Sequence, residues 1–145
     1  MELIHQALEE WPPDSPVRKI PVDRMTLAKR RWRGTAEDGR EFGFDLEAPL
    51  ADGAAIFAGD GAVYFVAQKY EAVLEIATTE VGKGSAAGAA RLGWMIGNLH
   101  FQIEILADLV RVTDDPALRQ LFLRENVAFT SCKRVFRPLS GGHHH

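Results

Sequence analysis

The fold of the second half of this chain depends on one run of residues, Gly97-Asn98-Leu99-His100-Phe101-Gln102-Ile103. Immediately upstream, residues 85–96 begin with Ser85, a favoured helix N-cap, and then place small and apolar side chains at helical spacing. Gly97 and Asn98 are residue types that readily adopt the left-handed conformation at the end of a helix. The sequence therefore predicts a helix that begins at Ser85 and closes at Gly97 and Asn98.

The residues after this helix change to the spacing of a strand. Phe101, Ile103 and Ile105 alternate with polar residues, which indicates a strand buried on one face. His100 then lies just past the helix end, where unpaired carbonyls favour a cation, either a proton on the imidazole or a bound metal ion. The alternative is a histidine that only caps the helix, because a protein metal site usually needs further ligands. Both interpretations stay open from the residues alone.

The remaining signals complete an α+β arrangement in the second half. The predicted elements are a strand over 72–78, a loop over 82–84, the helix from Ser85, a strand from Phe101, a strand over 109–112, a helix opened by Asp115-Pro116 and closed by Asn126, and a strand over 127–136. Their order is β-α-β-β-α-β, which is typical of the ferredoxin-like fold. We therefore predict a ferredoxin-like domain over residues 72–138 and a flexible Gly/His tail over 139–145.

The first half, residues 1–71, has the turn signals and apolar runs of an all-β domain. Asp-Gly pairs at 38–39, 52–53 and 60–61 are strong turn signals between strands. Residues 62–67 form a continuous apolar run, which predicts a strand buried on both faces. We expect a small sheet sandwich or open barrel of about six strands.

Composition limits the possible functions. The formal net charge of −3 argues against a general nucleic-acid binder, and the single cysteine, Cys132, fits a reducing cytoplasm. No apolar run approaches the length of a membrane span, and the first residues lack the pattern of a signal peptide. No catalytic constellation emerges, and Gly82-Lys83-Gly84-Ser85 lacks the glycine spacing of a phosphate-binding loop. We expect a cytoplasmic, non-enzymatic protein without nucleic-acid or membrane partners.

Two features raise the possibility of nucleic-acid binding. The basic cluster Lys29-Arg30-Arg31-Trp32-Arg33 faces nearby acidic residues, so we interpret it as a solvated, cross-strand-paired surface or a docking surface for an acidic protein. RNA-recognition modules share the β-α-β-β-α-β order but stack bases on aromatic side chains of the central strands. Residues 73–76 and 109–112 carry no aromatic side chain, which argues against that function.

Three motifs together resemble one known family. They are Gly97-Asn98-Leu99-His100 before an apolar strand, the basic run from Lys29 followed by Asp38-Gly39-Arg40-Glu41, and the terminal Arg137-Pro138-Leu139-Ser140-Gly141-Gly142-His143-His144-His145. In this order they are similar to the UreE-type urease accessory proteins, which are nickel metallochaperones. The resemblance covers nearly the whole chain.

The resemblance implies a function. UreE-like proteins are homodimers that bind nickel at a histidine pair between subunits, which matches His100 here, and an isologous dimer would supply two copies of it. His143, His144 and His145 would be auxiliary ligands, unless this run is the remnant of an expression tag. Copper or zinc also suit imidazole ligands. The implied partners are urease apoprotein and an accessory GTPase, with the first domain as a partner- or peptide-docking domain, and a dimer of dimers on metal is possible.

The chain also departs from the family pattern. Thr113-Asp114-Asp115-Pro116 lacks the extra histidines that many relatives carry there, and we interpret Asp114 and Asp115 as helix-capping acids. Leu46-Glu47-Ala48-Pro49 lacks the Pro-Arg-Gly that often follows the hairpin of the first domain. Cys132 fits a small residue on a sheet face better than a metal ligand. The alternative function is a protein-interaction module of the same fold that does not carry metal.

Overall fold

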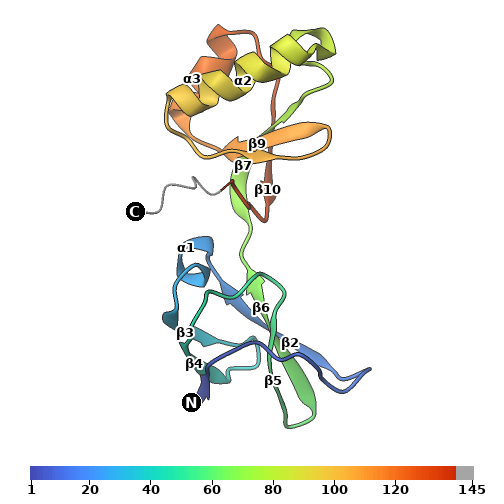
Figure 1. Cartoon of the computed structure of the whole chain (residues 1–145), viewed down its shortest axis with the longest axis vertical. Coiled ribbons are helices and arrows are strands. Elements are labelled where there is room, and N and C mark those ends of the chain that lie inside the picture. Colours follow the sequence, from blue (N-terminus) through green and yellow to red (C-terminus); the bar gives the residue numbers. More distant parts are fainter. Residues whose placement is uncertain (140–145) are drawn as a thin grey trace. The chain divides into compact units, whose positions relative to one another are not determined.

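The computed structural model describes residues 1–139 and divides the chain into two compact units, Met1–Lys69 and the part from Tyr70 onward (Figure 1). The predicted tail over 139–145 therefore lies outside the described residues except for Leu139. Among residues 1–139, no helix is both long enough and apolar enough to span a bilayer. Helices and strands are both present, so the chain is an α+β protein.

The first unit contains six strands and a short helix. The elements are β1 (Glu2–Ile4), β2 (Val17–Val22), α1 (Arg24–Leu27), β3 (Arg31–Thr35), β4 (Glu41–Asp45), β5 (Ala55–Gly59) and β6 (Ala62–Gln68). They form two three-stranded sheets with the orders β1-β4-β3 and β2-β6-β5. Both sheets contribute buried side chains to one core, in which Trp32 of β3 stacks on Phe44 of β4 with ring centroids 3.9 Å apart.

The predicted turns of the first unit are present. Gly39, Gly53 and Gly61 all have positive φ angles, as the Asp-Gly pairs require. The basic cluster is paired across strands in part, because Arg31 lies opposite Asp45 and its Nε donates a 3.0 Å hydrogen bond to that carboxylate. The sequence was therefore sufficient for the local hairpins of this unit.

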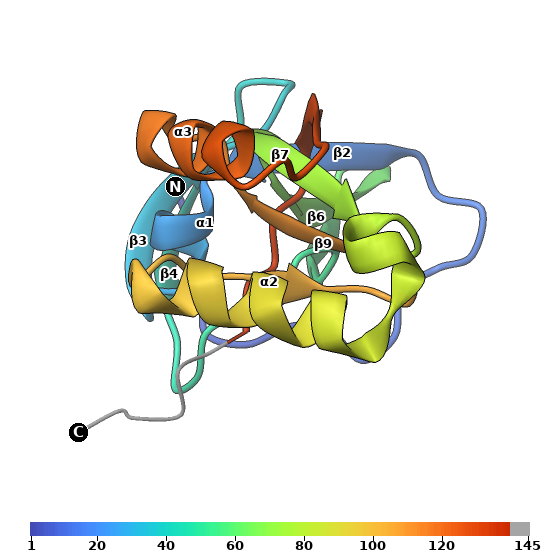
Figure 2. The ribbon, with the colours of Figure 1, turned by 90° about the horizontal axis from the view of Figure 1, so that it is seen from above.

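The second unit contains four strands in the order β10-β7-β9-β8, and every neighbouring pair is antiparallel. Its elements are β7 (Glu71–Ala77), the 3-10 helix η1 (Val81–Gly84), α2 (Ala86–Asn98), β8 (Glu104–Ile105), β9 (Leu109–Thr113), α3 (Pro116–Arg124) and β10 (Thr130–Arg134). Figures 1 and 2 show that α2 and α3 cover the same face of this sheet. The core between them includes Leu74, Ile76, Ile96, Val112 and Phe122.

The helix starts of this unit follow the sequence signals. Ser85 Oγ accepts a 3.0 Å hydrogen bond from Gly88 N at the start of α2, and Asp115 Oδ1 accepts one of 2.8 Å from Ala117 N at the start of α3. Asn126, past the end of α3, has a left-handed φ of 56°. These caps form because each needs only a short polar side chain and a backbone group two or three residues away.

Three predicted details were wrong. Gly97 and Asn98 do not close α2 by turning left-handed, since both remain helical and His100 is the left-handed residue. The strand expected from Phe101 is reduced to Glu104–Ile105, because only these two residues pair with β9. The last strand spans Thr130–Arg134 rather than 127–136, because only these five residues pair with β7.

Candidate metal site

His100 lies directly after α2, in a closed helix C-terminus. Its backbone N–H donates a 2.9 Å hydrogen bond to Gly97 O, and the N–H of Phe101 reaches Ile96 O at 3.4 Å. With Leu99 as the C-cap, these two bonds are the pair that defines a Schellman motif. Phe101 also packs against the core cluster that contains Ile96, which is the apolar contact that usually accompanies the motif.

This motif places an unusual residue type at a position that favours glycine. The φ angle of His100 is 63°, in the left-handed region. For an L-residue this conformation costs about 1–2 kcal/mol, although histidine tolerates it better than branched residues do. A strained backbone held by its surroundings is a common feature of functional sites. The backbone of His100 is thus fixed by hydrogen bonds to the end of a thirteen-residue helix.

The C-terminal end of α2 is exposed and partly apolar. His100 itself is exposed, and so are Trp94, with 67% of its surface accessible, and Leu99, with 42%. The negative end of the α2 helix dipole also points toward this end, which favours a cation there. The end of α2 therefore offers an accessible histidine, the negative end of a helix dipole and an exposed apolar side chain at Leu99.

The other predicted ligands do not complete a site within one chain. His143, His144 and His145 lie outside the described residues. Within residues 1–139, no group of three or more His, Cys, Asp or Glu side chains is placed to hold a metal ion. His5 belongs to the first unit, where its Nδ1 lies 3.0 Å from Asp45 O. His100 is the predicted ligand whose position the structure gives.

The acidic and thiol candidates are engaged elsewhere. Asp115 caps α3, as predicted, while Asp114 forms a two-pronged ion pair with Arg119, at 2.6 and 2.8 Å, that lowers the pKa of its carboxyl. Burial and a hydrogen bond to Glu75 raise the pKa of the Cys132 thiol. A thiol held protonated is a poor metal ligand. This agrees with the interpretation of Cys132 as a residue that fills a sheet face.

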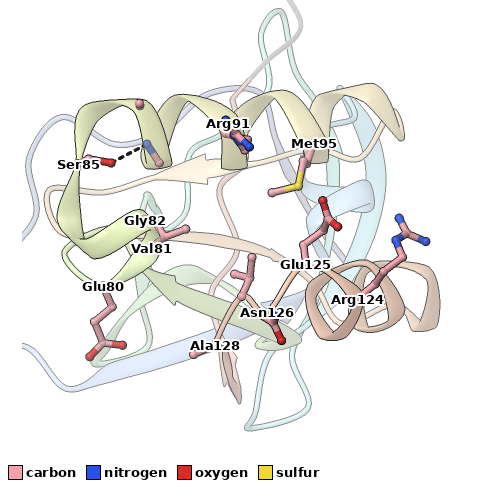
Figure 3. A pocket seen from close by; sticks show the side chains of 13 residues that line it. Glu80, Val81, Gly82, Ser85, Arg91, Met95, Arg124, Glu125, Asn126 and Ala128 are labelled. Carbon is pink, nitrogen blue, oxygen red and sulfur yellow. Dashed lines mark hydrogen bonds between the residues drawn. The ribbon is translucent and has the colours of Figure 1, made fainter.

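A separate groove of about 510 Å³ lies between η1, the first turns of α2 and the segment after α3 (Figure 3). Met95 contributes to its apolar lining, and Arg91, Arg124 and Glu125 bring charges of both signs. No histidine or cysteine is among the residues that line it. At one end the Ser85 hydroxyl is occupied with the Gly88 amide, as the dashed line in Figure 3 marks. The groove is therefore not part of the candidate metal site.

Sequence reasoning missed a row of charged residues on the sheet of the second unit. Arg111 of β9 lies directly opposite Glu75 of β7 and Glu104 of β8. Its guanidinium lies 2.7 Å from Glu75 Oε2 and 3.0 Å from Glu104 Oε1. The only signal in the sequence is the polar residue between Val110 and Val112, which predicts a side chain on the opposite face but not its partners.

The comparisons with known proteins agree with the resemblance seen in the motifs. The family model described as "UreE urease accessory protein, C-terminal domain" matches residues 71–145. The chain is 31% identical over 144 residues to the urease accessory protein UreE of Nitrosococcus oceani, covering 88% of this chain and 83% of that protein. It is 31% identical over 133 residues to the protein of that name from Azorhizobium caulinodans, and 27% identical over 133 residues to the one from Ralstonia nicotianae. The chain spans 62% and 61% of the lengths of these last two relatives. The chain belongs to the family of UreE urease accessory proteins.

Proposed function

We propose that this protein is a nickel carrier that delivers Ni(II) to urease apoprotein during assembly of the urease active site. Family membership gives the role in urease maturation. The observation that carries the metal proposal is His100. It is exposed at the end of a helix, and its backbone is held in a strained left-handed conformation. Nickel stands high in the affinity order for nitrogen ligands, and copper or zinc would bind to the same ligand in vitro.

A carrier needs a site that binds its ion without enclosing it. A closed set of four protein ligands retains a metal, whereas a site with few protein ligands leaves positions that an acceptor can occupy. Two His100 rings from a homodimer would form such an open site on a twofold axis. Leu99, the neighbour of His100 in the chain, and Trp94, farther back on α2, are exposed apolar side chains of the kind that such an interface would bury. Further pairing of dimers around a shared metal is compatible with this arrangement.

The second unit supplies the frame for this site. Its βαββαβ element order and its sheet order β10-β7-β9-β8 support its assignment to the ferredoxin-like fold, with the metal ligand at the end of the first helix. The first unit would dock the urease assembly machinery, including the accessory GTPase, in the cytoplasm. In this function the protein catalyses no reaction.

Equilibrium dialysis against nickel tests the proposal. We expect the chain ending at Leu139 to retain about one nickel ion per two chains, and the His100→Ala variant of that chain to retain none. Gel filtration of the same samples checks that the variant is still a dimer, so that a loss of metal is not caused by dissociation.

The alternative, an interaction module that carries no metal, predicts unchanged uptake after His100→Ala. It also predicts that all nickel binding disappears when residues 140–145 are removed. Either result would refute the assignment of His100 as the metal ligand.

A further inference from the structure

The basic cluster, residues 29–33, lies at the start of β3, an edge strand of the sheet β1-β4-β3 in the first unit (Figure 1). It concentrates positive charge in a unit that is acidic as a whole. Residues 1–69 contain nine Lys and Arg against twelve Asp and Glu, and four of the nine cations are Lys29, Arg30, Arg31 and Arg33. All four are exposed. Surfaces that only keep a protein in solution usually intersperse the two signs, so this local excess points to an interaction.

Three of these four cations have no ion-pair partner. Arg31 is the exception, because its Nε donates a 3.0 Å hydrogen bond to Asp45 of β4. This pair neutralises the carboxylate that lies directly opposite the cluster. Within residues 1–139, no carboxylate forms an ion pair with Lys29, Arg30 or Arg33. These three side chains therefore remain available to bind negative groups of another molecule.

A hollow of about 860 Å³ adjoins two of the unpaired cations. Its lining includes the charged Lys29 and Arg30 and the apolar Leu46 and Pro49. Hydrogen bonds hold the backbone around it, since Arg30 O accepts one of 2.9 Å from Leu46 N, and Lys29 N donates one of 2.9 Å to Thr26 O. The hollow is large enough for side chains of a docked segment. A carboxylate that entered it would meet two cations on a fixed backbone.

The solvent-facing side of the same sheet, which we call the outer face, adds exposed apolar side chains. In the register of the sheet, Leu3 of β1, Gly43 of β4 and Arg33 of β3 lie side by side. A Cβ placed on Gly43 would lie 3.1 Å from carbon atoms of both Leu3 and Met1. These two side chains therefore cover β4 next to Arg33, and they are 63% and 65% exposed. The outer face thus combines an unpaired guanidinium with accessible apolar surface.

This chemistry favours an acidic protein segment over nucleic acid. Binding of single strands relies on exposed aromatic side chains on which bases stack. Trp32, the aromatic residue within the cluster, is only 9% exposed and stacks on Phe44 in the core. The acidic remainder of the unit repels a long polyanion, whereas a short segment with few carboxylates contacts the basic part alone.

We propose that the basic cluster and the adjoining outer face form a docking surface for an acidic segment of a partner protein that also carries an apolar side chain. Carboxylates of the segment pair with Lys29, Arg30 and Arg33, and its apolar side chain packs on Leu3. The proposal deepens the docking role proposed for the first unit and is independent of His100. Exposed ion pairs are individually weak and screened by salt, so binding requires the three cations together.

Fluorescence anisotropy of a labelled synthetic peptide, titrated with the full chain, tests the proposal. The probe has about eight residues, a reach of about 26 Å when extended, with glutamates around one central leucine. One comparison probe replaces every glutamate by glutamine, and a second replaces the leucine by serine.

Two matched triple variants locate the binding surface. Lys29→Gln/Arg30→Gln/Arg33→Gln removes the unpaired cations of the cluster. The control, Lys83→Gln/Arg91→Gln/Arg124→Gln, likewise removes one lysine and two arginines, all exposed, from the second unit. Because the substituted side chains are exposed, both variants should unfold in urea at the wild-type midpoint.

We expect the cluster variant to bind the probe at least about tenfold more weakly than the wild type, and the control variant to bind within about twofold of it. The glutamine probe should bind the wild type no better than the cluster variant. Leu3→Ser should weaken binding of the leucine probe about threefold and leave binding of the serine probe unchanged, because only the leucine has an apolar contact to lose.

Three results would overturn the proposal. The wild type does not bind the probe, or the two triple variants weaken binding equally, so that overall charge and not this surface attracts the peptide. In the third, a single-stranded oligonucleotide of the same charge displaces the probe as well as unlabelled peptide does, so that the surface binds any polyanion.

Other results separate this proposal from the functions proposed above. If the cluster variant binds the probe as tightly as the wild type, a different surface holds the peptide, and this proposal fails while a docking role for the first unit stands. Nickel uptake of the cluster variant in dialysis should equal that of the wild type. The nickel-carrier function is therefore decided by His100→Ala alone, whatever the peptide titrations show.

Discussion

Replacing His100 by glycine should make the protein more stable while it abolishes metal binding. The left-handed conformation at φ 63° costs an L-residue about 1–2 kcal/mol, and glycine avoids this cost. Glycine also makes the unfolded chain more flexible, and the additional entropy lost on folding cancels about 0.4–1 kcal/mol of this gain in stability. The net expectation is an increase of about 0.5–1 kcal/mol in the free energy of unfolding for His100→Gly.

The comparison with alanine isolates the backbone. His100→Ala loses the imidazole but keeps a Cβ, so it retains the left-handed strain. We expect the free energy of unfolding of His100→Ala to lie within about 0.3 kcal/mol of the wild-type value and below that of His100→Gly. Both variants should lose nickel binding. The pair therefore separates the strain at this position from the role of the ring.

Urea unfolding at fixed protein concentration, in the presence of a chelator, measures these differences. Chelation removes the stabilisation that bound metal would add to the wild type alone. His100→Gly could instead unfold at the same urea concentration as His100→Ala, or at a lower one. In that case the backbone of His100 is not strained, and the interpretation of the Schellman motif as a strained support for a metal ligand is wrong.

Two further predictions concern the frame of the site. Ser85→Ala removes the side-chain acceptor of the Gly88 amide and should lower the free energy of unfolding by about 1 kcal/mol, with nickel binding in dialysis unchanged. Arg111→Ala leaves two mostly buried carboxylates facing each other and should cost about 3 kcal/mol in urea unfolding, the low end for breaking a buried ion pair because some solvent contact remains. Burial of Glu75 opposes its charge, but hydrogen bonds from Arg111 and Cys132, together with the positive charges of Arg111 and Arg134, outweigh this and lower its pKa. The stabilisation from a lowered carboxyl pKa is present above the unfolded pKa and is lost as the pH falls through the folded one. The wild type should therefore lose stability below about pH 4, and Arg111→Ala should lose less over the same range; parallel pH profiles would refute this account of Glu75.

The sequence predicts the local features of the second unit well and the long-range ones poorly. Caps at Ser85, Asp115 and Asn126 involve groups within a few residues of each other, so residue type alone identifies them. The helix ends at Asn98, as predicted, but the left-handed residue after it was misassigned, because Gly97 and Asn98 adopt that conformation more readily than His100. Their preference is overridden by the core contact of Phe101, which sets where the helix can close.

The candidate site divides in the same way. The motif around His100 and its position after a helix were readable from the sequence, since both are contiguous in the chain. The contact of Arg137 with Glu104 joins residues 33 positions apart. It depends on the order of strands in the sheet, which no local pattern specifies. The contact between Arg137 and Glu104 therefore could not be predicted before the sheet order was known.

The short strand β8 also has a consequence for the behaviour of the second unit in solution. An exposed sheet edge can recruit a strand from another molecule and so begin aggregation. β8 offers a ladder of only two residues, and the carbonyl of Ile103 just before it is already bonded to Leu139. At the other edge, β10 carries the exposed cations Lys133 and Arg134. Both edges of the sheet are therefore protected against pairing with strands of other molecules.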